Sequence, residues 1–167
     1  MNFDDAFEKL LGHEGGYSDD PKDRGNWTTG KIGQGALKGT KYGISAMSYP
    51  QLDIKNLRVD EAKAIYLTDY WLKAGCDCVP PEVAFDLFDT AVNSGPKTAA
   101  KLLQAAIGAT VDGAIGPATL FTLRSFTPAR FVARFNGARL LAMTNMTAWE
   151  SQGKGWARRV AQNLLGA

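Results

Sequence analysis

The sequence predicts a mainly α-helical protein with a small irregular or β-containing lobe after the first helix. The chain opens with apolar residues at helical spacing. Residues 15–45 then combine many glycines with turn-forming residues and hold few long apolar runs. From about residue 60 onward, helical apolar patterns return, and Gly or Pro separates one from the next. The length of 167 residues suits one domain with a substantial core.

The first predicted helix covers residues 3–14, because the apolar residues near the start of the chain fall on one helical stripe. This stripe consists of Phe3, Phe7, Leu10 and Leu11. Two glycines at 15 and 16 end the helix. In the lobe that follows, turns are expected at 19–21 and 24–26, and a short hairpin fits the remainder. The lobe ends in the segment Thr40-Lys41-Tyr42-Gly43-Ile44-Ser45.

Further helices are predicted after the lobe, each marked by a capping residue, a proline or a glycine. Asp60 can cap the first of them, which runs to about residue 74 and stops at Gly75. Prolines at 80 and 81 open the second, which ends at 93–95, and Pro96 opens the third, which reaches Gly108. After a polar loop at 111–116, Pro117 opens a short helix.

The last two predicted helices each carry an apolar face. Thr127 caps the first of them and Pro128 occupies its first turn. Its predicted inward residues are Phe131, Val132, Phe135, Ala138 and Leu141. The final helix places Trp156, Val160 and Leu164 on one side, which we expect to be buried.

Composition is that of an ordinary globular protein, with 45% hydrophobic and 22% charged residues. The sequence holds no run of eighteen apolar residues, and its acidic start lacks the apolar segment of a secretory signal. We therefore expect synthesis in a cytoplasm without a signal peptide. Cys76 and Cys78 are too close for an unstrained disulfide and far in sequence from His13, the single histidine, so we expect reduced structural thiols and no metal.

Charge is distributed unevenly along the chain. The last 67 residues contain eight basic and two acidic side chains, a net charge of +6, against −4 for the first hundred residues. A basic half favours an anionic partner such as a nucleic acid, a membrane surface or an acidic polymer. Solvated helix faces would produce the same pattern. No nucleic-acid-binding motif is present, so we expect no nucleic-acid partner, and nothing argues against a monomer.

Two carboxylates in contrasting surroundings are the candidate chemical groups. The apolar stripe of the first helix carries Glu14 toward the core, and both burial and the negative end of the helix dipole favour its protonated form. Asp23 follows nine residues later in a polar loop, where it would be ionised. Such a pair is typical of glycoside cleavage, and the hydroxyl of Thr40 or Thr29 can hold a nucleophilic water. A turn-stabilising role is the alternative for Asp23.

These residues fall in motifs that resemble the lysozyme-like muramidases of glycoside hydrolase family 108. The first motifs are Glu14-Gly15-Gly16-Tyr17-Ser18, Asp20-Pro21 with Asp23, and Thr40-Lys41-Tyr42-Gly43-Ile44-Ser45. The C-terminal half is similar to the peptidoglycan-binding region of that family. Its matching segments are Asp89 to Gly95, Leu103-Gln104, Asp112 to Leu120, and Gly155 to Val160. The resemblance covers almost the whole chain in order and implies a lysozyme-like fold.

The resemblance implies hydrolysis of the β-1,4 bond between N-acetylmuramic acid and N-acetylglucosamine, with no cofactor. Glu14 matches the catalytic glutamate of the family and would protonate the glycosidic oxygen. Asp23 and a threonine would assist the attacking water, with inversion if Asp23 lies across the cleft. Glu14, Asp23 and Thr29 reproduce the Glu-x8-Asp-x5-Thr spacing of related phage lysozymes, but the family motif selects Thr40, which we favour.

Four more residues are predicted to bind substrate. Tyr17 and Tyr42 flank the acid in sequence motif and either stack on sugar rings or pack in the core. Trp27 lies in the polar lobe, where a large aromatic often serves a sugar site, and Asn93 either lines the cleft or caps its helix. His13 should face solvent, since adjacent helix residues point in different directions.

The combined expectation is a phage or prophage endolysin, made in the bacterial host cytoplasm and acting on the cell wall in the periplasm. Residues 1–95 would form a catalytic lobe and residues 96–167 a helical peptidoglycan-binding lobe, packed as one unit. The basic half would contact the acidic peptide stems of peptidoglycan or an anionic envelope. A lytic transglycosylase, which needs the acid but no positioned water, and a non-catalytic wall-binding or secretion-assisting protein are the alternatives.

Overall fold

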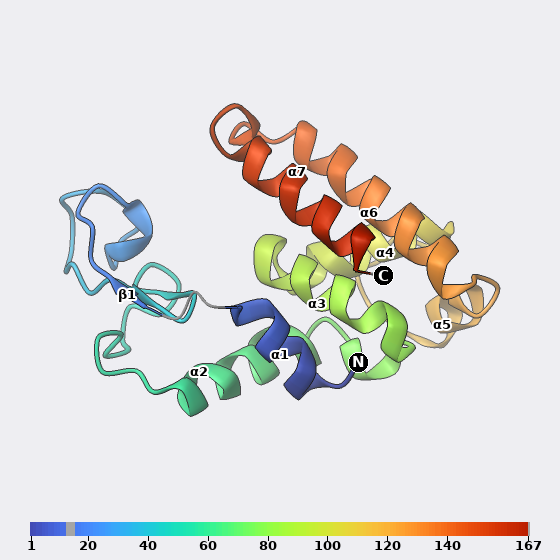
Figure 1. Cartoon of the computed structure of the whole chain (residues 1–167), viewed down its shortest axis with the longest axis horizontal. Helices are drawn as coiled ribbons and strands as arrows, with labels where there is room; N and C mark the ends of the chain where they lie inside the picture. The colour runs from blue at the N-terminus through green and yellow to red at the C-terminus, as the bar shows by residue number, and fades with distance from the viewer. Residues whose placement is uncertain (13–15, 167) are drawn as a thin grey trace. The chain divides into compact units, whose positions relative to one another are not determined.

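The computed structural model describes residues 1–12 and 16–166, and His13, Glu14, Gly15 and Ala167 lie outside the described residues. The described chain is mainly helical and carries a small three-stranded sheet after its first helix, which confirms the predicted fold class (Figure 1). Its residues group into two compact units, one formed by residues 7–66 and the other by residues 1–6 and 67–167. Within the described ranges, no helix is long and apolar enough to cross a membrane.

The smaller unit is organised around an antiparallel sheet. Strands β1 (Tyr17–Ser18), β2 (Thr40–Lys41) and β3 (Ile44–Ser45) lie in that order, and Thr40 stands opposite both Ser18 and Ser45. A short 3₁₀ helix, η1 (Arg24–Asn26), lies between β1 and β2 in the chain. Tyr42 and Gly43 join β2 to β3 with φ angles of +51° and +76°, which is the type I′ turn that suits the twist of paired strands.

Helix α2 (Val59–Ile65) and the second half of α1 (Phe3–Leu11) supply the core of this unit together with the sheet. The rings of Phe7 and Tyr66 lie 5.6 Å apart between centroids. The Tyr66 hydroxyl donates a 3.1 Å hydrogen bond to the carbonyl of Tyr42, which ties the hairpin turn to the end of α2. The buried apolar residues of the unit are Phe7, Ile44, Ala46, Ile54, Leu57, Ala62 and Tyr66.

The larger unit is built from helices. They are η2 (Tyr66–Leu72, a π-helix that begins at the unit boundary), η3 (Cys76–Cys78, 3₁₀), α3 (Pro81–Ser94), α4 (Pro96–Ile107), α5 (Pro117–Leu123), α6 (Pro128–Thr144) and α7 (Trp149–Leu165). Helix α3 packs against α4 and α6, and α6 packs along α7 (Figure 1). Both cysteines of η3 are free thiols, and burial raises the pKa of Cys76 well above its usual value.

Proline and glycine mark helix ends where the sequence predicts them. Helix α3 begins at Pro81 and stops before Gly95. Helix α4 begins at Pro96 and stops before Gly108, whose φ of +75° ends the helix. The Thr127 side chain accepts a 3.3 Å hydrogen bond from the backbone N–H of Arg130 and so caps α6.

Several predicted details are wrong. Helix α1 ends at Leu11, because Gly12 leaves the helical conformation with a φ of +51°. Arg58, and not Asp60, caps α2, and its backbone N–H donates a 2.8 Å hydrogen bond to the side chain of Glu61. The helix changes from α to π at residue 66 and is therefore not a single α-helix to residue 74. Leu141 and Leu164, predicted to face inward, are 67% and 44% exposed.

Helix α6 also buries polar side chains, and the apolar pattern of the sequence did not predict their burial. Arg139 is fully buried and donates a 2.6 Å hydrogen bond to Asp89 of α3. Arg159 of α7 donates a second, also of 2.6 Å, to the other oxygen of Asp89, and Asn163 adds a third at 3.0 Å. Two of the eight basic residues after position 100 therefore neutralise a core carboxylate.

A second buried polar centre holds the loop before α5. Gln104 of α4 is fully buried, and its amide nitrogen donates to the Asp112 carboxylate at 2.6 Å and to the Ala114 carbonyl at 3.0 Å. Its amide oxygen accepts a 2.8 Å hydrogen bond from the backbone N–H of Gly113. These contacts give a structural reason for the motif residues Gln104 and Asp112. The predicted functional boundary between residues 95 and 96 falls between α3 and α4 and stays a prediction.

Candidate active site

Glu14, the predicted general acid, lies outside the described residues, as does His13. The described part of the predicted site is the segment from β1 to β3, in which Asp23 and Thr40 are the candidate water-binding groups. Both belong to the smaller unit. Glu14 precedes the first residue of β1 by three positions in the sequence, and β1 pairs Ser18 with Thr40.

Asp23 is exposed and starts the η1 turn as its N-terminal cap. Its Oδ1 atom accepts a 2.8 Å hydrogen bond from the backbone N–H of Gly25. This oxygen therefore stabilises the turn, as the alternative interpretation of Asp23 predicts. A carboxylate accepts through two oxygens, so this turn contact leaves Asp23 able to take a proton from water.

Thr40 is half-buried in β2, and its hydroxyl donates a 2.7 Å hydrogen bond to the side-chain oxygen of Asn26. Asn26 is fully buried and lies in the same turn as Asp23. The structure thus links the two candidate groups, Asp23 and Thr40, through a single residue. Sequence reasoning missed Asn26, because an asparagine beside Gly25 is the usual sign of an exposed turn.

Thr29, the alternative selected by spacing alone, has a local structural task. Its hydroxyl donates a 2.7 Å hydrogen bond to the carbonyl of Gln34 and accepts one of 3.3 Å from the backbone N–H of Lys31. These bonds close a turn in the loop between η1 and β2. The difference between the two threonines agrees with the preference for Thr40, which stays a prediction.

The predicted aromatic residues take part in the framework of the lobe. The Tyr17 hydroxyl donates to the carbonyl of Lys38 at 3.2 Å, and partial burial, then the charges of Asp19 and Asp53, raise the Tyr17 pKa above its usual 10. The indole N–H of Trp27 donates a 2.9 Å hydrogen bond to the carbonyl of Pro21. Both residues are half-buried.

Tyr42 and Asn93 occupy different kinds of position. Tyr42 is the first residue of the hairpin turn, is half-buried, and has the ammonium of Lys41 5.4 Å from its ring centroid. Asn93 is half-buried in the last turn of α3, in the larger unit. The structure therefore groups Asp23, Thr40, Tyr17, Trp27 and Tyr42 in one unit, and the role of Asn93 stays a prediction.

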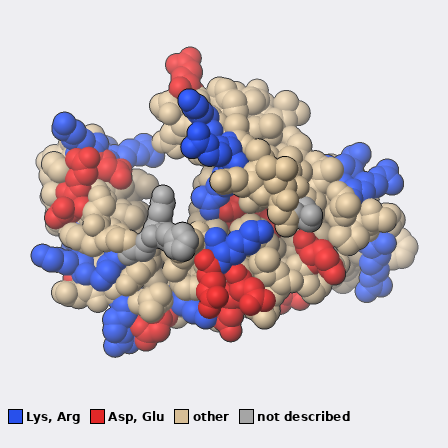
Figure 2. All heavy atoms as spheres, in the orientation of Figure 1, with Lys and Arg blue, Asp and Glu red and all other residues tan. Residues whose placement is uncertain are grey.

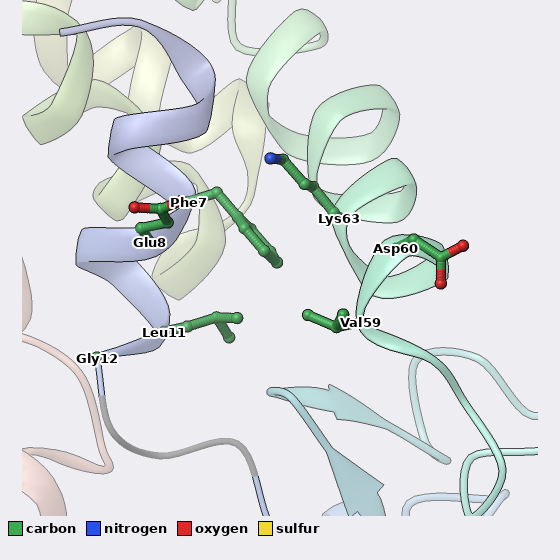
Figure 3. A pocket seen from close by; sticks show the side chains of 7 residues that line it. All are labelled: Phe7, Glu8, Leu11, Gly12, Val59, Asp60 and Lys63. Carbon is green, nitrogen blue, oxygen red and sulfur yellow. The ribbon is translucent and has the colours of Figure 1, made fainter.

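A pocket of about 390 Å³ lies at the end of α1, against the start of α2. Phe7, Leu11 and Val59 point into it, whereas the carboxylates of Glu8 and Asp60 point away on opposite sides (Figure 3). No two carboxylates face each other among the described residues that line this pocket. Among the described residues, no three His, Cys, Asp or Glu side chains form a group that could hold a metal ion.

Comparisons with known proteins identify the family and the fold of this chain. A family profile described as glycosyl hydrolase 108 matches residues 7–95, more than half of the chain. Eleven chains of solved structures also match. One of them, described as the structure of Brucella abortus SagA, superposes with a TM-score of 0.81 at 31% sequence identity, covering 97% of this chain and 91% of that chain. Among curated proteins, none matches.

Proposed function

Because this chain belongs to the glycosyl hydrolase 108 family, a family of glycoside hydrolases whose membership suggests a peptidoglycan substrate, we propose that it is a muramidase. The bond cleaved is the β-1,4 bond between N-acetylmuramic acid and N-acetylglucosamine. The observation that carries this proposal is the family match itself. It spans residues 7–95 and so contains Glu14, Asp23 and Thr40 in their motifs.

In the proposed reaction, Glu14 donates its proton to the glycosidic oxygen while the bond from that oxygen to the anomeric carbon breaks. A water molecule held by Asp23 and Thr40 attacks the same carbon, and Asp23 accepts the proton that the water loses. Glu14 leaves the step ionised and Asp23 leaves it protonated, so charge and protons balance. Attack by water on the face opposite the leaving group inverts the anomeric centre.

Mass spectrometry of purified peptidoglycan digested by the protein tests the assignment. Fragments that end in reducing N-acetylmuramic acid are the expected products. Anhydro-muramyl ends would identify a lytic transglycosylase, which needs no positioned water and would remove the proposed roles of Asp23 and Thr40. If no soluble fragments appear, the enzymatic proposal fails and a wall-binding protein becomes the better description.

Replacing Glu14 with Ala tests the proposed acid. We expect Glu14→Ala to lose nearly all hydrolysis, since the leaving sugar then departs without a proton, a contribution of about 10² to 10⁴ in rate. Glu14→Gln is the matched variant of nearly equal shape. Circular dichroism and thermal unfolding should resemble those of the wild type for both. A folded Glu14→Ala protein with full activity would exclude Glu14 as the acid.

We also propose that the C-terminal half contributes binding to the wall or to an anionic envelope surface. Buried Arg139 and the paired Arg159 are excluded from this role by their contacts with Asp89. The remaining basic side chains are exposed, and Lys and Arg gather over α5 and the start of α6 (Figure 2). The exposed set is Lys101, Arg124, Arg130, Arg134, Lys154 and Arg158.

The proposed biological setting is bacterial lysis by a phage or prophage endolysin. The chain would be made in the host cytoplasm and would reach the wall through a lesion in the membrane. The cell-wall substrate and the basic C-terminal half support this setting. Expression of the chain in a bacterium with and without a permeabilised inner membrane tests it, because lysis is expected only after permeabilisation.

A further inference from the structure

We propose that Asn26 is a positioning residue that fixes the hydroxyl proton of Thr40, so that Thr40 can act on the nucleophilic water only as a hydrogen-bond acceptor. This inference rests on the proposed function, in which Asp23 and Thr40 hold that water. It concerns a residue that is fully buried and does not itself reach the sugar.

The orientation of the Asn26 amide is determined by both of its ends. The amide nitrogen donates a 3.0 Å hydrogen bond to the carbonyl of Asp20, and the amide oxygen accepts the 2.7 Å hydrogen bond from Thr40. The reversed amide would place its oxygen against the Asp20 carbonyl oxygen, where two acceptors repel. The side-chain oxygen of Asn26 therefore faces Thr40, and the Thr40 hydroxyl must be the donor between them.

The backbone of Asn26 is held as firmly as its side chain. Its N–H donates to the carbonyl of Asp23 at 3.2 Å, which closes the turn that begins with Asp23. Its carbonyl accepts from the backbone N–H groups of Lys38 at 3.0 Å and Gly39 at 3.1 Å, directly before β2. Asn26 thus joins the Asp23 turn to the strand that carries Thr40, and both candidate groups depend on its position.

The chemical consequence concerns the water. A threonine hydroxyl has one proton and two lone pairs, and the bond to Asn26 uses the proton. Thr40 can then only accept a hydrogen bond from the water, and the Asp23 carboxylate is also only an acceptor. With both of its protons directed to Thr40 and Asp23, the water presents a lone pair to the sugar carbon, which is the orientation that attack requires.

Three substitutions separate this role from a purely structural one. Asn26→Leu frees the Thr40 proton, and Thr40→Val removes the hydroxyl. Replacing both partners, in Asn26→Leu with Thr40→Val, pairs two apolar groups and recovers stability more readily than leaving one buried polar group without its partner. If Asn26 acts only through the Thr40 hydroxyl, the double variant should have the kcat of Thr40→Val. If its role is structural, Asn26→Leu should lower kcat further in the Thr40→Val background.

We expect each single variant to lower kcat on peptidoglycan by about tenfold to a hundredfold, with KM within about twofold of the wild type. The double variant should unfold at a higher temperature than Asn26→Leu and yet keep the low kcat. The proportion of anhydro ends should rise in all three, because the cleavage that remains is less dependent on positioned water. Thr40→Ser should restore most of the kcat that Thr40→Val loses.

Thr29→Val is the matched control, since it removes the same hydroxyl from the other threonine. We expect its kcat and product ends to equal those of the wild type. A folded Asn26→Leu or double variant with wild-type kcat overturns the inference, and so does a loss of kcat in Thr29→Val with none in Thr40→Val. If Asn26→Leu does not fold, Thr40→Val and the double variant decide the question. Failure of the wild type itself to release fragments overturns the proposed function as well, which distinguishes the two failures.

Discussion

Two carboxylates on α3, three residues apart, experience opposite surroundings. Burial raises the pKa of Asp86, and its main compensation is a single 2.8 Å hydrogen bond from the Asn136 amide. Burial acts on Asp89 in the same direction, but the charges and hydrogen bonds of Arg139 and Arg159 outweigh it and hold the Asp89 pKa below its usual value. Asp89 is therefore ionised in the fold, whereas Asp86 is the group that folding favours in its protonated form.

Asp89→Asn and Asp86→Asn form a matched pair that tests this difference. Removing the charge of Asp89 leaves Arg139 buried without its counter-ion, so we expect the free energy of unfolding to fall by about 3–5 kcal/mol. Asp86→Asn keeps an oxygen that accepts from Asn136, so we expect a change below about 1 kcal/mol at neutral pH. Chemical denaturation of both variants provides the measurement, and an equal effect of the two substitutions would contradict the assignment.

Asp86 and Asp89 should contribute to the pH dependence of stability with opposite signs. The lowered pKa of Asp89 contributes stability that is present above the unfolded value of about 3.9 and is lost as the pH falls through the folded pKa. The raised pKa of Asp86 contributes stability below about pH 3.9, and this is lost as the pH rises through the folded pKa. Between pH 2 and 6, about the usual carboxylate range, stability should rise less steeply with pH in Asp89→Asn than in the wild type.

Single polar residues such as Asn26 and Arg139 mark the limit of prediction from this sequence. Each is fully buried, and the partner that permits burial is remote in sequence, fourteen residues away for Asn26 and fifty for Arg139. A local pattern assigns such residues to turns or solvent, because an unpaired buried amide or guanidinium is unstable. Asp23 and Thr40 could be selected from motifs, but the residue that joins them could not.

The β2–β3 hairpin shows why its motif has a glycine in the fourth position. Gly43 has a φ of +76° in the two-residue turn, a conformation that side chains disfavour. A Cβ at this position would also collide with the Tyr66 hydroxyl, which bonds the neighbouring carbonyl of Tyr42. Ile44, the next residue, is 1% exposed. The segment Thr40 to Ser45 is thus a structural unit that places the Thr40 hydroxyl on Asn26.

Substitution of Gly43 by Ala should cost stability in two ways, through backbone strain and through the collision with Tyr66. Comparing Gly43→Ala with Gly33→Ala separates these two costs. Both glycines have a φ of +76°, but a Cβ on Gly33 meets nothing within 4 Å. We expect Gly33→Ala to cost about 1–2 kcal/mol from backbone strain alone. Gly43→Ala should cost about 1–3 kcal/mol more, since the Tyr66 hydroxyl must move. Thermal unfolding measures both, at about 2–4 °C per kcal/mol, and equal shifts would mean that Tyr66 yields without cost.

Element boundaries followed from the sequence wherever proline or glycine dictates the backbone. Pro81, Pro96 and Pro128 each open a helix at the predicted residue, because the ring fixes φ and the missing N–H is not needed there. The change from α to π at Tyr66 carries no comparable signal. The apolar stripe of α6 also fails to indicate that Leu141 is exposed. Arg139 is buried instead, because it pairs with Asp89.

The basic side chains of the last 67 residues fall into two groups: those that form contacts within the fold and those that remain for a partner. The sequence gives +6 for the last 67 residues, yet Arg139 and Arg159 are used within the fold against Asp89. Arg134 donates a 2.6 Å hydrogen bond to the Ala106 carbonyl and has its guanidinium 5.8 Å from the ring centroid of Phe126. The cations that remain for a partner are therefore fewer than the sequence suggests. Four of the exposed ones, Arg124, Arg130, Lys154 and Arg158, are suitable for a test.

Replacing those four residues with Gln should weaken the binding of the chain to purified cell walls and reduce the dependence of binding on salt. Exposed charges separated from an anionic surface by more than about 8 Å are screened at physiological ionic strength, so the difference from the wild type should be largest at low salt. The control replaces Lys9, Lys22, Lys31 and Lys55 with Gln, which removes the same charge from exposed positions before residue 96. Co-sedimentation across a salt series measures both. A larger loss of wall binding in the first set locates the binding surface in the C-terminal half. Equal losses would mean that net charge alone holds the protein to the wall, and that the helices after α4 contribute no binding surface of their own.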